Sequence, residues 1–176
     1  MTIVVRKLSE VSSTQIEQLA DVLIDCVDGG ASVSFMSPLA RNTAVQFWQR
    51  VASDAASGAR VLLVAVDPEA GIVGTVHLVT DLPPNQPHRA DVSKLLVHRK
   101  ARRQGVALQL MQSLEQAALE VGRHVLVLDT VTGGPAARLY ESLGFVRVGD
   151  IPDFALWPQG GYCSTTYFYK HLKRTD

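Results

Sequence analysis

The fold is decided by one stretch of the chain, Leu95-Leu96-Val97-His98-Arg99-Lys100-Ala101-Arg102-Arg103-Gln104-Gly105-Val106-Ala107. Its residues pass from an apolar strand through a basic turn into an amphipathic helix. The first turn of a helix leaves backbone N–H groups without intrahelical partners and carries about +0.5 elementary charge, so it suits an anion. Gly105 and Ala107 are small where an anion would approach the backbone, and Arg102 and Arg103 add positive charge. The stretch favours a pyrophosphate site, although an ordinary strand-to-helix turn with a solvated basic surface has the same pattern.

The length and composition indicate one globular domain covering residues 1–176. Hydrophobic residues make up 47% of the chain and charged residues 19%, which is typical of a sequence that buries a core rather than of a disordered one. The 17 basic residues balance the 17 acidic ones, so no overall field attracts DNA, RNA or an anionic membrane. We therefore expect neither nucleic acid nor a membrane as a partner.

The N-terminus and the cysteines argue against further classes of protein. The first residues place a short apolar run before charge, the reverse of a signal peptide, and no segment approaches the length of an uninterrupted apolar membrane span. We expect a cytoplasmic protein. Cys26 and Cys163 lie far apart without CxxC or Cys/His spacing, and the histidines form no ligand cluster, so we expect no metal site and no cysteine nucleophile.

Hydrophobic periodicity, caps and turns predict an alternation of strands and helices. Strands are expected at residues 2–8, 60–66, 72–80, 89–98, 124–130, 145–148 and 164–171. Helices are expected from Ser12 to Val27, from Ser37-Pro38 to Ala55, at 105–121 and at 135–143. Residues 67–71 resemble a hairpin turn, and 82–87 a proline-rich surface loop. This order predicts a mixed α/β sheet with the basic turn at its centre.

Three of these elements carry expectations about burial and ends. Helix 105–121 is expected to bury one apolar stripe, made of Leu108, Met111, Leu114, Ala118 and Val121. The nearly unbroken apolar run at 124–130 is typical of a strand that is covered on both faces. Gly144 follows helix 135–143 and suits a left-handed helix end.

Two motifs resemble those of a known superfamily. Arg102-Arg103-Gln104-Gly105-Val106-Ala107 resembles the Arg/Gln-x-x-Gly-x-Gly/Ala signature of the GCN5-related N-acetyltransferases (GNAT), and Tyr140-Glu141-Ser142-Leu143-Gly144-Phe145 resembles their Tyr-x-x-x-Gly-Phe ending. The separation of the motifs and the elements that carry them also match. The resemblance implies the GNAT fold, a single α/β domain with a mixed, mostly antiparallel central sheet flanked by helices, and it implies acetyl-CoA as cosubstrate.

The resemblance also implies where acetyl-CoA binds. In the superfamily the pyrophosphate lies on the loop and helix start that correspond here to Arg102, Arg103, Gln104, Gly105, Val106 and Ala107. The pantetheine arm pairs with the backbone of the preceding strand, here Leu95, Leu96 and Val97. Backbone N–H groups of that strand could also stabilise a developing oxyanion.

Acetyl transfer to an amine also needs a proton acceptor and a proton donor. A substrate ammonium is not nucleophilic, so a carboxylate or a water chain must take its proton, and Asp91 and Asp129 are the candidates. Asp129 follows an apolar strand, at the end where open α/β sheets bind ligands, but it could instead cap the turn at Gly133-Gly134. Tyr140 matches a tyrosine that commonly protonates the CoA sulfur in the superfamily, and the alternative is a half-buried packing residue.

Longer segments resemble one family within the superfamily, the tabtoxin-resistance acetyltransferases. The segments are residues 29–36, 89–95 and 128–130, together with the tail from residues 147–152 through 167–168. In that family two carboxylates and a tyrosine serve β-lactam amino-acid binding and catalysis, at positions that match Asp91, Asp129 and Tyr140. Glutamate stands there where Asp91 stands here, and that departure leaves the acceptor undecided.

The loop between the first two helices is expected to cover the acceptor. The superfamily commonly places its acceptor lid there, and the residues expected to contact the acceptor are Gly30, Ala31, Ser32 and Phe35. A plain interhelical turn is the alternative for this loop.

These residues together predict an acetyl-CoA-dependent N-acetyltransferase that works by direct attack in a ternary complex. The expected acceptor is a small-molecule amine, either amino-acid-like or a β-lactam antimetabolite, which would make the protein a resistance enzyme against an antibiotic or toxin. The alternatives are an aminoglycoside or a protein N-terminus as acceptor, or a CoA-binding sensor without catalysis. The sequence allows a homodimer.

Overall fold

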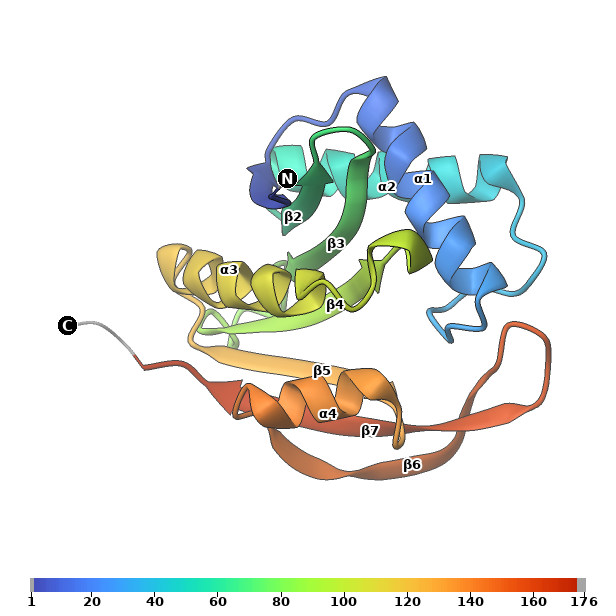
Figure 1. The fold of residues 1–176 in the computed structure, drawn as a ribbon. Coiled ribbons are helices and arrows are strands. Elements are labelled where there is room, and N and C mark those ends of the chain that lie inside the picture. The colour runs from blue at the N-terminus through green and yellow to red at the C-terminus, as the bar shows by residue number, and fades with distance from the viewer. Residues whose placement is uncertain (1, 174–176) are drawn as a thin grey trace.

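One seven-stranded sheet runs through the protein and carries helices on both faces (Figure 1). The computed structural model describes residues 2–173. The strands are β1 (Val4–Leu8), β2 (Arg60–Asp67), β3 (Gly71–Val79), β4 (Arg89–Val97), β5 (Val125–Val131), β6 (Val146–Leu156) and β7 (Tyr162–His171). The helices are α1 (Ser13–Asp28), α2 (Arg41–Ser57), α3 (Val106–Glu120) and α4 (Pro135–Ser142), with a short 3₁₀ turn, η1 (Arg99–Ala101), before α3.

The order of strands across the sheet is β1-β2-β3-β4-β5-β7-β6. Every neighbouring pair is antiparallel except β4 and β5, which are parallel. A single parallel pair in the middle of an antiparallel sheet needs a long crossover, and α3 supplies it. The predicted fold, a mixed and mostly antiparallel sheet flanked by helices, is confirmed.

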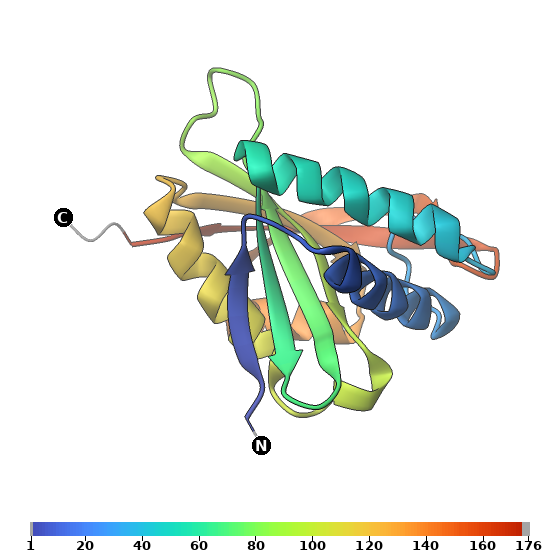
Figure 2. The same ribbon diagram turned by 90° about the horizontal axis from the view of Figure 1, so that it is seen from above.

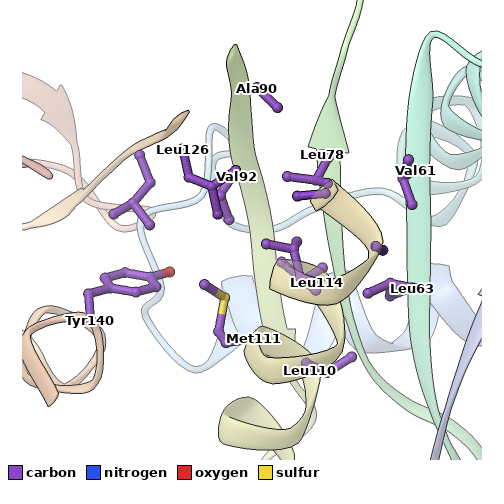
Figure 3. Close-up of a cluster of buried hydrophobic side chains, with 14 of the residues drawn as sticks. Val61, Leu63, Leu78, Ala90, Val92, Leu110, Met111, Leu114, Leu126 and Tyr140 are labelled. Carbon is purple, nitrogen blue, oxygen red and sulfur yellow. The ribbon is translucent and has the colours of Figure 1, made fainter. Parts of the chain in front are cut away.

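Two apolar cores lie on the two faces of this sheet, with α3 on one side of the strands and α1 with α2 on the other (Figure 2). In the first core, Leu110, Met111 and Leu114 of α3 lie against β2 and β3, while Tyr140 of α4 closes the core from the side of β5 (Figure 3). The second core joins α1 and α2 to the opposite face of β2 and β3 around Trp48. After the acetyl donor and the acceptor amine expected from the sequence, we call the side of α3 and α4 the donor face and the side of α1 and α2 the acceptor face.

The ends of α1 follow from local chemistry. The hydroxyl of Ser12 accepts a hydrogen bond from the Gln15 backbone N–H at 3.2 Å, and the Gln15 side chain accepts one from the Ser12 N–H at 2.9 Å. This capping box satisfies two N–H groups that the helix leaves unpaired. The helix ends at Gly29, and Gly30 adopts a left-handed φ of 89°. Both predicted ends are confirmed.

Helix α2 begins at Arg41, so the prediction of a start at Ser37-Pro38 is wrong. The Ser37 backbone N–H donates to the carbonyl of Pro158 at 2.9 Å, in the turn between β6 and β7. Ala40 has an extended conformation and stands at the N-cap position. The tie to a distant turn keeps residues 37–40 out of the helix, and no local pattern announces such a contact.

The buried face of α3 differs in part from the predicted stripe. Met111, Leu114 and Ala118 are buried as expected, whereas Leu108 and Val121 are 39% and 38% exposed. The buried face begins at Val106, and Leu108 lies about 200° around the helix from it. Val121 is the C-cap residue, beyond the last helical turn. The remaining buried positions of this helix are Leu110 and Ala117.

Two strands also depart from expectation. Strand β5 is covered on one face only, because Leu126 and Leu128 are buried while Asp129 on the other face is exposed. Strand β6 continues to Leu156 instead of ending at 148. Two register shifts interrupt its pairing with β7, and the second, between Ile151 and Ala155, contains Pro152, which an edge strand tolerates better than a central one. Residues 2–173 contain no helix with both the length and the apolarity to cross a membrane.

We expect the two leucines on opposite faces of α3 to differ sharply in their contribution to stability. Leu114→Ala removes a fully buried side chain and should lower the free energy of unfolding by about 3 kcal/mol. Leu108→Ala is the matched control and should cost less than about 1 kcal/mol. Urea denaturation of both variants measures the difference. Equal losses would contradict the assignment of the buried face.

Candidate active site where strands β4 and β5 separate

The parallel pairing of β4 with β5 is short. Arg89–Asp91 pair with Val125–Val127, and the pairing ends there although β4 continues to Val97 and β5 to Val131. Figure 1 shows the two strands diverging beyond this point. The second half of β4 therefore has β3 as its partner strand on one side and presents its other edge to the space beside β5. An extended ligand arm could pair with that edge as a strand would.

A bulge shapes β4 where this open edge begins. The register against β3 shifts between Thr75 and His77, and Lys94 has a left-handed φ of 53°. An extra residue inserted in one strand reverses the alternation of its side chains. Val92 before the bulge faces the donor-face core, and Leu96 after it lies in the acceptor-face core.

The turn after β4 presents an unoccupied helix start. Gly105 is the N-cap of α3 with a left-handed φ of 75°, and no side chain caps the first turn. The position that a Gly105 side chain would occupy has no heavy atom within 4 Å. The helix thus begins at a position that is open on the Gly105 side, and its first N–H groups have no side-chain cap, which suits the pyrophosphate of acetyl-CoA.

The polar side chains of this turn have different roles in the structure. Arg102 bends back, so that its Nε donates to the Val97 carbonyl at 3.1 Å and its Nη2 lies 4.0 Å from the Cys26 Sγ. The Gln104 amide donates to the Lys100 carbonyl at 3.3 Å. Arg103 is exposed. Arg103 is thus the free cation of the motif, while Arg102 and Gln104 stabilise the turn itself.

Asp25 of α1 anchors the start of the turn. Its carboxylate accepts the Arg99 backbone N–H at 2.7 Å and the Arg99 Nε at 2.9 Å. Burial raises the pKa of Asp25, but the two hydrogen bonds from Arg99 and the charge of His98 outweigh burial and leave the pKa below its usual value. Sequence reasoning missed Asp25, because only the fold brings α1 to this turn.

The two candidate carboxylates lie on the same, acceptor face of neighbouring strands. Asp91 is the register partner of Val127, and Asp129 follows two residues later on β5. Asp91 is ion-paired with Arg89 on its own strand. Asp129 accepts a hydrogen bond from the Thr165 hydroxyl at 2.7 Å, across the strand pair to β7. Asp129 does not cap the turn at Gly133-Gly134, so that alternative is wrong.

Tyr140 lies on the other face of the sheet. Its ring packs between Phe145 and Phe168, with centroids 5.6 Å and 6.1 Å away. Burial raises its pKa well above the usual value, and the charge of Asp129 adds to the shift. The hydroxyl forms no hydrogen bond with any residue in the range 2–173, and it points toward Met111, on the side of the core where Val92 and Leu126 also lie (Figure 3). Tyr140 is therefore a buried residue whose hydroxyl is free.

The loop between α1 and α2 crosses to the far end of the sheet. The Ser32 hydroxyl donates to the Leu156 carbonyl at 3.2 Å and accepts from the Cys163 thiol at 3.5 Å. The Phe35 ring packs edge-on against Phe47 of α2 at 5.2 Å. Gly30 and Ala31 begin the loop directly after α1. The loop thus contacts β6 and β7 as well as its own helices, on the face that carries Asp91 and Asp129.

Sequence reasoning missed two residues beside these carboxylates. Tyr167 is the register partner of Asp129, and burial raises its pKa, with further contributions from Asp129 and Asp91. Lys94 places its Nζ 3.1 Å from the Ser34 hydroxyl in the interhelical loop. A lone lysine within an apolar strand was a usable signal for Lys94. Residues 2–173 contain no group of three or more His, Cys, Asp or Glu side chains placed to hold a metal ion.

Known proteins match this chain in both sequence and fold. The sequence model of the acetyltransferase (GNAT) family matches residues 31–145. Human N-acetyltransferase 8 is 34% identical over 103 residues, which cover 58% of this chain and 44% of that protein, so the match spans less than half of its length.

Solved structures agree over nearly the whole chain. An N-acetyltransferase from Staphylococcus aureus Mu50 superposes with a TM-score of 0.81 at 16% identity, covering 98% of this chain and 100% of that one. A phosphinothricin acetyltransferase from Sinorhizobium meliloti, solved with acetyl-CoA, gives 0.80 at 16% identity, covering 100% and 95%. The resemblance drawn from the two sequence motifs is confirmed. Since the family model covers well over half of its residues, the chain belongs to the acetyltransferase (GNAT) family.

Proposed function

We propose that the chain is an acetyl-CoA-dependent N-acetyltransferase that acts on the amine of a small molecule by direct attack in a ternary complex. One observation carries the proposal. A carboxylate, Asp129, and a phenol, Tyr140, lie on opposite faces of the sheet beside the point where β4 and β5 stop pairing. This arrangement lets an acceptor and a donor approach the same opening from two sides, each with its own proton-transfer group.

The donor side is assigned to the turn and to the open edge of β4. Bound acetyl-CoA supplies an acetyl thioester, whose acyl carbon an amine can attack. The N–H groups at the start of α3, together with Arg103, would hold the pyrophosphate. The backbone of Leu95, Leu96 and Val97 lies beyond the β5 pairing and would bind the pantetheine arm.

Asp129 is assigned as the group that takes the proton of the acceptor ammonium. Its carboxylate is exposed on the acceptor face and has a single hydroxyl partner, Thr165, so it keeps an oxygen lone pair for a ligand. Asp91 has one oxygen engaged by Arg89 and is assigned to orienting the amine. A water chain ending at either carboxylate is the alternative route for the proton.

Tyr140 is assigned as the proton donor to the departing thiolate. Burial raises its pKa above the usual value, so the phenol still carries its proton at neutral pH when the thiolate forms, although the same shift makes it a weaker acid toward that thiolate. The hydroxyl has no competing partner within residues 2–173 and is free to donate. The phenol is neutral before it donates its proton, and it is neutral again once it has taken a proton back from solvent.

The finer acceptor class rests on the similarity of residues 29–36, 89–95 and 147–152 to the tabtoxin-resistance acetyltransferases. We propose an amino-acid-like or β-lactam acceptor and, with it, a role in resistance. A cytoplasmic location and a homodimer are further proposals, and neither depends on that similarity. CoA release from acetyl-CoA, measured with amino acids, β-lactam amino acids, polyamines and aminoglycosides, tests the proposal. CoA binding without release for any amine would favour the sensor.

The helix start can be tested with two glycines that flank α3 and share one backbone conformation. Gly105 and Gly122 have φ of 75° and 74°, and neither has a neighbour within 4 Å of its missing Cβ. Alanine at either position should cost about 1 kcal/mol of stability through backbone strain. Gly105→Ala should also raise the Kd for CoA at least tenfold, while Gly122→Ala should not. Calorimetric titration with CoA separates the two, and equal affinities would contradict the pyrophosphate site.

Asp129→Asn should lower kcat/KM for the acceptor by about 10²-fold and leave the KM for acetyl-CoA unchanged, since the amide cannot take a proton but can still accept from Thr165. Asp150→Asn is the matched control, because Asp150 also accepts a threonine hydroxyl of β7, Thr166, at 2.7 Å. Steady-state kinetics with each substrate varied in turn measures both effects. Weakened acetyl-CoA binding in Asp129→Asn would point to a structural role.

Tyr140→Phe should lower kcat by about 10²-fold with little change in melting temperature, because the ring packing stays and the hydroxyl has no protein partner to lose. The loss should shrink with a thioester whose leaving thiol is more acidic. Comparing kcat for two such donors, alongside thermal unfolding, measures both points. If kcat falls by the same factor with both donors, Tyr140 acts only as a packing residue and water is the proton source.

A further inference from the structure

We propose that Lys94 and Ser34 bind the carboxylate of the acceptor, so that the substrate is a zwitterion that carries its amine and its carboxylate close together. The inference rests on the proposed function, because it places a second contact in the same acceptor site. It is carried by the position of Lys94, by its unpaired charge and by the charges around it.

The bulge in β4 brings Lys94 to the acceptor face. Lys94 lies three residues after Asp91, the last residue of β4 that pairs with β5. Its left-handed φ marks the start of the bulge. Its ammonium lies 3.1 Å from the Ser34 hydroxyl and 5.9 Å from the centre of the Phe47 ring. Phe47 in turn contacts Phe35 of the interhelical loop. The ammonium therefore meets the loop that was expected to contact the acceptor.

Lys94 is half-buried and lacks an anionic partner among residues 2–173. Its contacts are one neutral hydroxyl and one aromatic ring. Lys170 shows the contrast on the opposite face, since its ammonium also lies over a ring, Phe145 at 5.7 Å, but pairs with Glu115 at 2.6 Å. A partly desolvated cation gains most from a charged hydrogen-bond acceptor, and a carboxylate is the kind of group that fits a lysine and a hydroxyl side by side.

The charges around Lys94 favour an anion. Burial lowers its pKa, and the nearby Arg60 adds to the shift, while Asp129 opposes it. Arg60 is itself paired with Asp54, and His77 is buried with a pKa held well below its usual value, so His77 adds no charge of its own. Asp129 is thus the opposite charge that acts on Lys94, and the two groups form no direct ion pair.

A zwitterion would complement these two separated charges. Its ammonium would meet Asp129, which is assigned to take the proton, and its carboxylate would meet Lys94 and Ser34. An acceptor that carries amines alone, such as a polyamine or an aminoglycoside, would bring further positive charge to Lys94 and leave it unpaired. The site therefore selects for a carboxylate near the reacting amine.

The test compares acids with their amides. L-Phenylalanine and L-methionine are assayed for CoA release against L-phenylalaninamide and L-methioninamide, with wild type, Lys94→Met, and Lys170→Met as the matched control. The acid-to-amide ratio of kcat/KM should fall about tenfold to a hundredfold in Lys94→Met, the loss expected for one charged hydrogen bond, and stay unchanged in Lys170→Met. Differences in amine basicity cancel because each ratio is compared between proteins. Lys94→Arg should restore part of the ratio.

A binding measurement separates this inference from the proposed catalysis. Protein saturated with CoA is titrated with N-acetyl-L-phenylalanine and with its amide. Tighter binding of the acid that disappears in Lys94→Met supports the carboxylate site, even if no amine is acetylated and the proposed activity fails. The carboxylate site is overturned if Lys94→Met leaves the acid-to-amide ratio of kcat/KM unchanged and the two products bind equally well. Acetylation of both acids and amides in that case would still support the proposed acetyltransferase.

Discussion

The short parallel pairing between β4 and β5 is the constraint on which the site depends. Three residue pairs hold the two halves of the sheet together, and beyond Asp91 the strands separate. The bulge at Lys94 reverses the alternation of side chains along β4, and the Asp25 carboxylate fixes the turn that follows by holding Arg99. A fully paired β4 would leave no edge for a ligand arm and no opening between the faces. The candidate site thus lies where the pairing of β4 with β5 ends within an otherwise continuous sheet.

The interruption divides the chemistry between two environments. On the donor face Tyr140 lies among Phe145, Phe168 and the apolar side chains of α3, where burial keeps the phenol protonated. On the acceptor face Asp129 is exposed, and a charged amine can reach it from water. The proposed acid, Tyr140, and the proposed base, Asp129, would pair with one another if they shared one face, whereas the sheet keeps them apart and lets both approach one opening.

Much of the fold was predictable because its signals are local. The Ser12 capping box, the turn before β3, and Gly105 at the start of α3 each depend on a few neighbouring residues. The errors have a common cause in tertiary contacts. Helix α2 starts later than predicted because the Ser37 N–H bonds to Pro158. Leu108 was predicted to be buried but is exposed, because the sheet, and not the sequence spacing, selects the buried face of α3. Lys94 and Asp25 were missed because their partners are distant in sequence.

The hydrogen-bond and ion-pair partners of a residue distinguish its role better than its position in a motif does. Arg102 and Arg103 stand side by side in one motif, yet Arg102 is bound to the Val97 carbonyl and only Arg103 is left for an anion. Asp91 and Asp129 share one face, and the ion pair with Arg89 engages Asp91 while Asp129 keeps an open oxygen. Asp91 stays beside Arg89, which leaves Asp129 and Lys94 as the charges that a ligand on this face would meet.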